Sequence, residues 1–106
     1  MEDIFVYIHF SLQSTFGMPS KHILIKGKVQ GVFYRATAKK EAEKMGITGW
    51  VRNTSKGDVE IMSSGNEAQL ELFIEWCKIG PQRAEVASVL VTHLDEISFQ
   101  QFEIKR

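Results

Sequence analysis

The stretch Gly27–Arg35, which reads GKVQGVFYR, constrains the fold most because it joins an apolar strand pattern to a helical pattern. Gly27 and Gly31 permit backbone angles that residues with a Cβ atom resist, so the chain can curl and point successive N–H groups at one place. Such a place suits an anion. The positive charge of Arg35, at the expected start of the helix, opposes the helix dipole unless an anion lies between them. The glycine spacing alone, however, favours an ordinary strand-to-helix turn with a surface arginine.

Regular elements are expected on both sides of this stretch. In Lys21–Lys26, Ile23 and Ile25 recur with a period of two, and apolar residues also reach the second face, which predicts a central strand. After the loop, spacings of four, four and three place four residues on one helical face: Tyr34, Ala38, Ala42 and Met45. Gly46 is expected to form the left-handed C-terminal cap of this helix.

The next segment predicts a hairpin followed by a helix. Two strands, Ile47–Asn53 and Val59–Ser64, are joined by a polar turn over Thr54–Asp58. Asn66 and Gln69 then have the spacing of a capping box. The helix that follows has one apolar face, made by Leu70, Phe73, Ile74 and Cys77, and it ends at Gly80-Pro81.

The last part of the chain predicts two strands. Ala84–Leu94 is long and rich in valine, and Phe99–Lys105 has apolar residues two apart. The resulting order is β-α-β-β-α-β, and the long fourth strand segment is expected to contribute to two pairings. This order predicts an α+β protein with a ferredoxin-like sandwich, in which two helices cover one face of an antiparallel sheet.

Size and composition bound the function. A chain of 106 residues has room for a single core and no cleft between domains. Thirteen basic and thirteen acidic residues leave no overall field for nucleic acid or a membrane surface, so we expect neither as a partner. The single cysteine, Cys77, excludes an internal disulfide and predicts a cytoplasmic location. The three histidines lie far apart, so we expect no metal site.

Residues 1–20 form an N-terminal extension of uncertain structure before a domain at residues 21–106. The apolar run Ile4–Ile8 follows acidic residues and is short, which argues against a secretory signal and a membrane span. Met18 could be the natural start of the chain, or the run could add an edge strand. We expect the extension to be dispensable, because every predicted core element lies after Ser20.

The stretch Gly27–Arg35 closely resembles the signature loop of the acylphosphatase family, small enzymes that hydrolyse the mixed anhydride of a carboxylate and phosphate. Further segments support the resemblance: Gly49–Asn53, Gly57–Glu60, and Gly80-Pro81 followed by Ala84 and Val86. Together these matches span residues 21–106. Tyr34 stands where many members carry phenylalanine, a change that keeps the ring and adds a hydroxyl group.

The resemblance implies a ferredoxin-like hydrolase that releases a carboxylate and inorganic phosphate, with phosphate also acting as an inhibitor. It implies a phosphoryl group held by the loop residues Gln30, Gly31, Val32, Phe33, Tyr34 and Arg35, with the Arg35 guanidinium bidentate to two oxygens. By its place after Gly49–Arg52, Asn53 matches the family's water-orienting asparagine. A neutral amide suits this role because it accepts and donates hydrogen bonds without repelling phosphate. Without the resemblance, Asn53 is interpreted as a turn residue.

The expected catalytic residues are therefore Arg35 and Asn53, acting in a monomer by direct attack of water, without a metal ion or other cofactor. Nothing in the sequence forms a dedicated acyl pocket, so we expect broad acyl tolerance. Two other classes of protein stay open. Phe33 and Tyr34 could stack bases in an RNA-binding module, although their place in a loop and the zero net charge argue against it. A non-catalytic phosphate-binding domain is the other, because a fold and an anion site do not by themselves imply turnover.

Overall fold

The computed structural model of the protein describes residues 18–106, and the predictions made for residues 1–17 lie outside that range. The described elements are β1 (Met18–Lys28), α2 (Tyr34–Lys44), β2 (Thr48–Asn53), β3 (Val59–Ser64), α3 (Glu67–Ile79), β4 (Glu85–Ile97) and β5 (Phe102–Ile104). All seven predicted elements are present in the predicted sequence, and β5 adds a fifth strand to the β-α-β-β-α-β order. The first strand begins three residues earlier than expected, so residues 18–20 are strand rather than extension.

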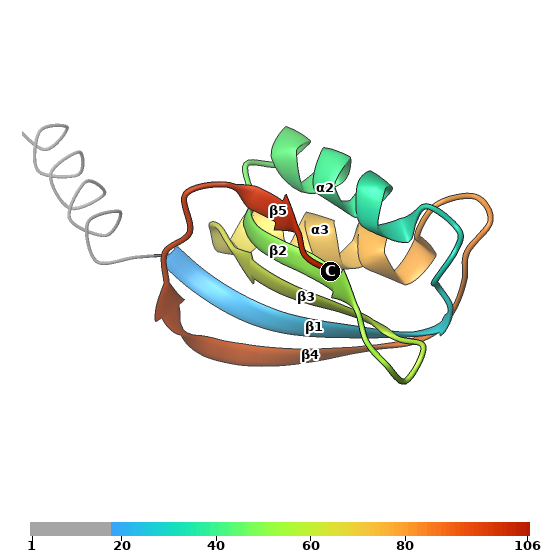
Figure 1. Ribbon diagram of the computed structural model, residues 1–106. Coiled ribbons are helices and arrows are strands. Elements are labelled where there is room, and N and C mark those ends of the chain that lie inside the picture. Colours follow the sequence, from blue (N-terminus) through green and yellow to red (C-terminus); the bar gives the residue numbers. More distant parts are fainter. Residues whose placement is uncertain (1–17) are drawn as a thin grey trace, which may run out of the picture.

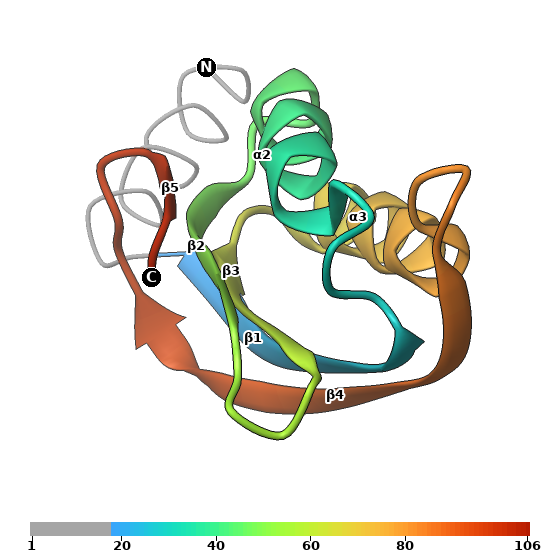
Figure 2. The same ribbon diagram turned by 45° about the vertical axis from the view of Figure 1, so that its right-hand side comes forward.

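The five strands form one sheet in the order β4-β1-β3-β2-β5. β1 is central, as predicted, and pairs antiparallel with both β3 and β4. β2 and β3 form the predicted antiparallel hairpin. Figures 1 and 2 show α2 and α3 packed side by side on the same face of this sheet. The ferredoxin-like α+β architecture is thus confirmed.

Two details of the sheet differ from the sequence prediction. Within the described residues β4 pairs with β1 and with no second strand, so the long segment does not contribute to two pairings. Residues 98–101 instead carry the chain to the opposite edge of the sheet, where β5 pairs with β2 (Figure 1). β5 runs parallel to β2, because the chain reverses direction after β4 and β4 itself is antiparallel to β2.

The core lies between the sheet and the two helices. The alternation predicted for β1 holds, since Ile23 and Ile25 are fully buried. The predicted helical faces are also buried: Tyr34, Ala38 and Ala42 from α2, and Leu70, Phe73 and Cys77 from α3. Aromatic rings pack within this core, and the Phe73–Phe102 pair joins α3 to β5. The Phe73 ring lies 6.1 Å from that of Trp76 and 6.1 Å from that of Phe102, within the range of favourable aromatic pairs.

Three of the four helix ends carry the predicted or an ordinary cap. At the end of α2, the Ile47 N–H donates to the Ala42 carbonyl over 2.8 Å around Gly46, which has a φ of +70°. At the start of α3, the Gln69 N–H donates to Asn66 Oδ1 over 2.8 Å, and Gln69 Oε1 accepts from the Asn66 N–H. α3 ends at Gly80, also as predicted. The N-terminus of α2 is the exception.

Candidate functional site

The loop between β1 and α2 is held from inside by two valines. Val29 and Val32 are 1% and 5% exposed and belong to the core, whereas Gly31 and Phe33 between and after them are exposed. Burial of these two valine side chains fixes the loop on the core, since each fully buried valine stabilises the fold by about 1.5–3 kcal/mol. The exposed residues are thereby presented to solvent in a fixed arrangement.

The two glycines of the loop serve different purposes. Gly27 lies at a register shift between β1 and β4, and a Cβ atom there would come within 2.2 Å of the Glu85 carbonyl oxygen. Gly27 is therefore required for close contact of two strands rather than for an anion. Gly31 has a φ of +75° and open space around it, so its backbone conformation alone favours glycine. The predicted curl of the chain is confined to the second glycine and the residues after it.

Phe33 has a φ of +66°, the only positive value outside glycine in residues 18–106. This left-handed conformation costs a residue with a Cβ atom about 1–2 kcal/mol. The Phe33 side chain is 70% exposed, so core packing does not offset that cost. Such outliers concentrate at ligand-binding sites. The sequence prediction missed this feature, because phenylalanine gives no signal for a left-handed backbone.

The N-terminus of α2 has no cap. Phe33 at the N-cap position contributes no side-chain hydrogen bond, and the first turn contains no acidic residue. No backbone carbonyl of residues 18–106 accepts a hydrogen bond from the N–H groups of residues 31–36. Unsatisfied N–H groups at a helix start carry partial positive charge and bind anions. α3, whose N-terminus has a complete capping box, offers no comparable site.

Arg35 is the second residue of α2, which confirms its predicted place at the helix start. It is partly exposed and forms no ion pair with any side chain that the structure describes. A cation in the first turn of a helix opposes the helix dipole. The uncapped N–H groups and the Arg35 guanidinium therefore combine positive charge at one place.

Asn53 ends β2, and its Oδ1 atom is buried without a hydrogen-bond partner in the described part of the chain. It is the only buried side-chain oxygen or nitrogen in residues 18–106 of which this is true. Buried polar atoms are nearly always hydrogen-bonded, so an exception points to a bound water or ligand.

A single cavity of about 310 Å³ brings the predicted catalytic residues together. Of the residues singled out from the sequence, the cavity is lined by Gly31, Phe33, Tyr34, Arg35 and Asn53. Four lining residues were missed, namely Val29, Ala36, Ile104 and Arg106. Ile104 is the last residue of β5, and Arg106 follows two residues beyond it. The two-residue spacing of Phe102, Ile104 and Arg106 was the available signal, because alternate residues of a strand share a face.

Two residues assigned to the phosphate loop do not line this cavity. Val32 is in the core. The Gln30 side chain points to the β2–β3 hairpin instead, where its Nε2 donates to the carbonyl oxygens of Thr54 and Asp58, each over 2.8 Å. Gln30 thus ties the loop to the turn that directly follows Asn53. Their backbone N–H groups stay part of the predicted loop.

The Tyr34 side chain is structural. Its ring is buried beside Trp76, with ring centroids 5.3 Å apart, and its hydroxyl donates to the Cys77 carbonyl over 2.7 Å. This bond joins the start of α2 to the end of α3. Burial raises the pKa of the Tyr34 hydroxyl far above its usual value and that of the Cys77 thiol to about 12. Both groups are neutral at physiological pH.

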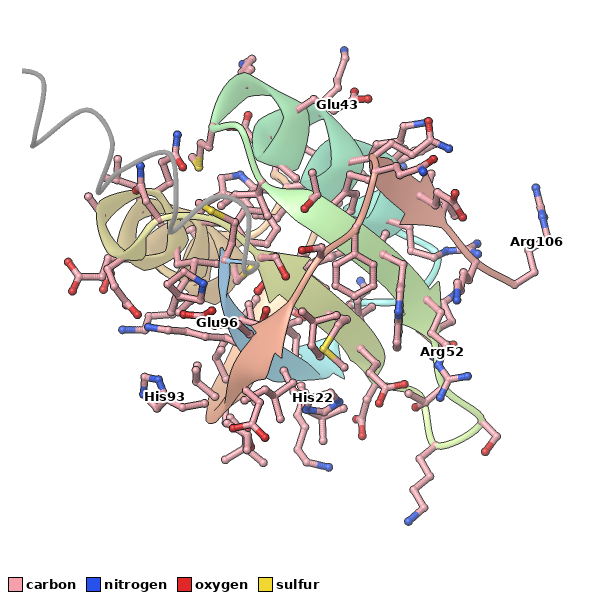
Figure 3. All side chains as sticks on the ribbon, turned by 90° about the vertical axis from the view of Figure 1, so that its left-hand side faces the viewer. His22, Glu43, Arg52, His93, Glu96 and Arg106 are labelled. Atoms are coloured by element: carbon pink, nitrogen blue, oxygen red, sulfur yellow. The ribbon has the colours of Figure 1, made fainter. Side chains whose placement is uncertain are left out.

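Trp50 lies on the face of the sheet that α2 and α3 leave uncovered. The Arg52 guanidinium and the Lys105 ammonium lie 5.3 and 5.1 Å from the centre of its ring. Figure 3 shows Arg52 and His22 on this side of the sheet. These cation–π contacts indicate that Trp50 packs against side chains of its own sheet face.

Within residues 18–106, no three His, Cys, Asp or Glu side chains gather as the ligands of a metal ion would. Neither α2 nor α3 is long and apolar enough to cross a membrane. The fold and cavity together define a small ferredoxin-like α+β domain whose first strand-to-helix loop opens onto the candidate site.

Comparison with known proteins identifies the family. The acylphosphatase family model matches residues 21–104. The acylphosphatase of Marinobacter nauticus is 49% identical over 73 residues, which are 69% of this chain and 79% of that protein. The structure of the Bacillus subtilis acylphosphatase matches with a TM-score of 0.82 at 34% identity, covering 84% of this chain and 100% of that one. An acylphosphatase structure from Coxiella burnetii matches with a TM-score of 0.80 at 35% identity, covering 84% and 94%.

The chain belongs to the acylphosphatase family, so the resemblance drawn from its sequence is confirmed. The prediction that it is a hydrolase of this class is confirmed by the same comparisons.

Proposed function

We propose that this protein hydrolyses acyl phosphates to a carboxylate and inorganic phosphate, by attack of water on a phosphoryl group held by the N-terminus of α2 and Arg35. Asn53 positions the water. One observation carries the proposal: Asn53, whose buried Oδ1 has no hydrogen-bond partner in residues 18–106, lines the same cavity as Arg35 and an uncapped helix N-terminus. An anion site and a water-binding amide side by side are what this reaction requires.

The phosphoryl group is held by donors that need no rearrangement. The N–H groups of residues 31–36 supply hydrogen bonds, and the Arg35 guanidinium supplies a bidentate, charge-assisted pair. The left-handed backbone of Phe33 turns these N–H groups outward. The folded protein already contains this strained conformation before a ligand binds. Because these donors neutralise the phosphoryl oxygens, we propose that turnover needs no added metal ion.

Asn53 Oδ1 accepts a hydrogen bond from the attacking water and thereby orients a lone pair of the water oxygen toward phosphorus. A bond forms between that oxygen and phosphorus, and the bond from phosphorus to the acyl oxygen breaks. The electron pair leaves with the carboxylate, which is a weak base and takes no proton. No Asp, Glu or His side chain of residues 18–106 lines the cavity, so the proton of the water passes to a phosphoryl oxygen.

The remaining expectations belong to the same proposal. The enzyme acts as a monomer in the cytoplasm, and inorganic phosphate binds the site as product and inhibitor. A ligand that binds only the folded state stabilises it by mass action, so phosphate should also raise the melting temperature.

The test is hydrolysis of benzoyl phosphate in ¹⁸O-labelled water, with and without EDTA. We expect turnover that EDTA leaves unchanged, competitive inhibition by phosphate, and one ¹⁸O atom in the phosphate released. Label in benzoate would show attack at the acyl carbon and contradict the mechanism. Phosphate binding without any turnover would instead indicate the non-catalytic phosphate-binding domain.

A further inference from the structure

The end of the chain supplies two cavity residues that the proposed phosphate site does not use, Ile104 and Arg106. Alternation along the strand explains their position. Phe102 is buried in the core, and Ile104 and Arg106 follow at intervals of two on the same side. The Lys105 N–H donates to the Val51 carbonyl over 2.8 Å and so extends the pairing with β2 past Ile104. Arg106 is thereby held beside the strand that ends at Asn53.

The charged side chains that line this cavity are all cationic. Its ionisable lining residues are Arg35, Arg106 and the buried Tyr34, and no Asp or Glu lines it, although the whole chain carries equal numbers of acidic and basic residues. Arg35 and the N–H groups of α2 meet the charge of one phosphoryl group. Arg106 is exposed, extends outward from the end of β5 (Figure 3), and forms no ion pair within residues 18–106. Arg106 is therefore a second cationic side chain at the cavity, apart from the one assigned to the phosphoryl group.

The cavity also offers apolar surface beyond the phosphate site. Phe33 and Ile104 are exposed hydrophobic residues, 70% and 38% accessible, and both line it. Its volume of about 310 Å³ reaches the lower end of the range of small-molecule pockets. These two side chains give the cavity apolar surface that an acyl group can contact.

We propose that Arg106 is a specificity residue that favours acyl phosphates whose acyl part carries a second negative charge, a carboxylate, while Phe33 and Ile104 contact its carbon skeleton. This inference rests on the proposed function. It replaces the broad acyl tolerance expected from the sequence with a graded preference. Because Arg106 is exposed, its charge is partly screened, and the preference falls as salt concentration rises.

The test compares 4-carboxybenzoyl phosphate with 4-carbamoylbenzoyl phosphate, a neutral substrate of nearly the same shape. The measured quantity is the ratio of their kcat/KM values, in which general effects on folding and catalysis cancel. In Arg106→Gln we expect the ratio to fall roughly two- to fivefold, the scale of an exposed ion pair. Arg106→Lys should restore part of the preference.

Lys105→Gln is the matched control. It removes the same charge from the neighbouring residue, whose ammonium lies over Trp50 on the other face of the sheet. Lys105→Gln should leave the ratio unchanged. A ratio unaffected by Arg106→Gln, or lowered equally by Lys105→Gln, would overturn the assignment of Arg106. If the wild-type protein hydrolysed neither substrate, the proposed function itself would fail, which is a distinct result.

Discussion

Phe33 is a single residue on which the shape of the phosphate loop depends. Its left-handed backbone turns the chain between Gly31 and the first turn of α2, and its side chain gains little burial in return. A residue with a Cβ atom pays about 1–2 kcal/mol for this conformation, whereas glycine adopts it without that cost.

We therefore predict that the Phe33→Gly variant is more stable than Phe33→Ala, by roughly 0.5–1 kcal/mol after the greater flexibility of unfolded glycine is subtracted. Denaturant unfolding of both variants measures the difference. Lys40, exposed within α2, serves as a control where the order should reverse, with alanine favoured by about 1 kcal/mol. An alanine variant at least as stable as the glycine variant at position 33 would contradict the prediction.

At the scale of single residues, the sequence indicated candidate site residues where a family motif and the chemistry of the side chain pointed to the same role. Arg35 and Asn53 came from the family motif, and the structure brings both to one cavity. The conformation of Phe33 was not predictable, because it depends on the buried neighbours Val32 and Tyr34 on either side rather than on Phe33 itself. Arg106 was missed although its spacing from Phe102 places it on the same face, because the cavity that it reaches depends on the parallel pairing of β5 with β2.

The two helices differ in how their N-termini are satisfied. α3 has a capping box formed by its own side chains, and α2 has no cap. The capping box was predictable because it is a contact between residues three apart. The topology of β4 and β5 was harder, since a long valine-rich segment fits one strand with two partners as well as it fits an edge strand followed by a crossover.

The β2–β3 hairpin and the loop between β1 and α2 are held together by Gln30. Its amide donates to two carbonyl oxygens of the turn that follows Asn53. Gln30→Ala removes two hydrogen bonds, so we expect a loss of about 1–2 kcal/mol of stability. The end of β2 should also shift relative to α2, and kcat should fall by roughly tenfold, because small displacements of positioned groups slow catalysis strongly.

Steady-state kinetics and denaturant unfolding test this prediction. Because the Gln30 side chain does not line the cavity, the inhibition constant of phosphate should change less than kcat. Gln101→Ala is the matched control, since Gln101 is exposed and, within residues 18–106, its side chain bonds only to Glu103. A wild-type kcat in Gln30→Ala would show that Gln30 does not help to position Asn53.

At the scale of the whole molecule, the sheet face that α2 and α3 leave uncovered carries charged pairs, and no helix within residues 18–106 packs on it. Glu60 on β3 bonds to His22 over 2.7 Å and also pairs with Arg52. The hydrogen bond from His22 and the pair with Arg52 lower the pKa of Glu60, although desolvation acts in the opposite direction.

A carboxyl group with a lowered pKa in the folded state stabilises the protein above its unfolded pKa of about 4.3. That contribution is lost as pH falls through the folded-state pKa. We predict that wild type is more stable than Glu60→Gln at pH 7 and that the difference disappears on acidification below about pH 4. Unfolding measured from pH 3 to 7 tests this, with Glu96→Gln, at an exposed position on β4, as a control with little pH dependence. A difference independent of pH would contradict the role of the Glu60 charge.

The central claim is that one cavity separates two tasks, holding the phosphoryl group by Arg35 and positioning water by Asn53. The most direct measurement is calorimetric titration of phosphate into wild type, Arg35→Ala and Asn53→Ala, alongside steady-state kinetics of the same proteins. Arg35→Ala should lose both phosphate binding and turnover, because its clamp acts in the ground state and the transition state. Asn53→Ala should bind phosphate nearly as wild type does, while kcat falls by roughly 10²–10³ with KM little changed. An Asn53→Ala enzyme with near-normal kcat, or an Arg35→Ala protein that still binds phosphate like wild type, would contradict the account.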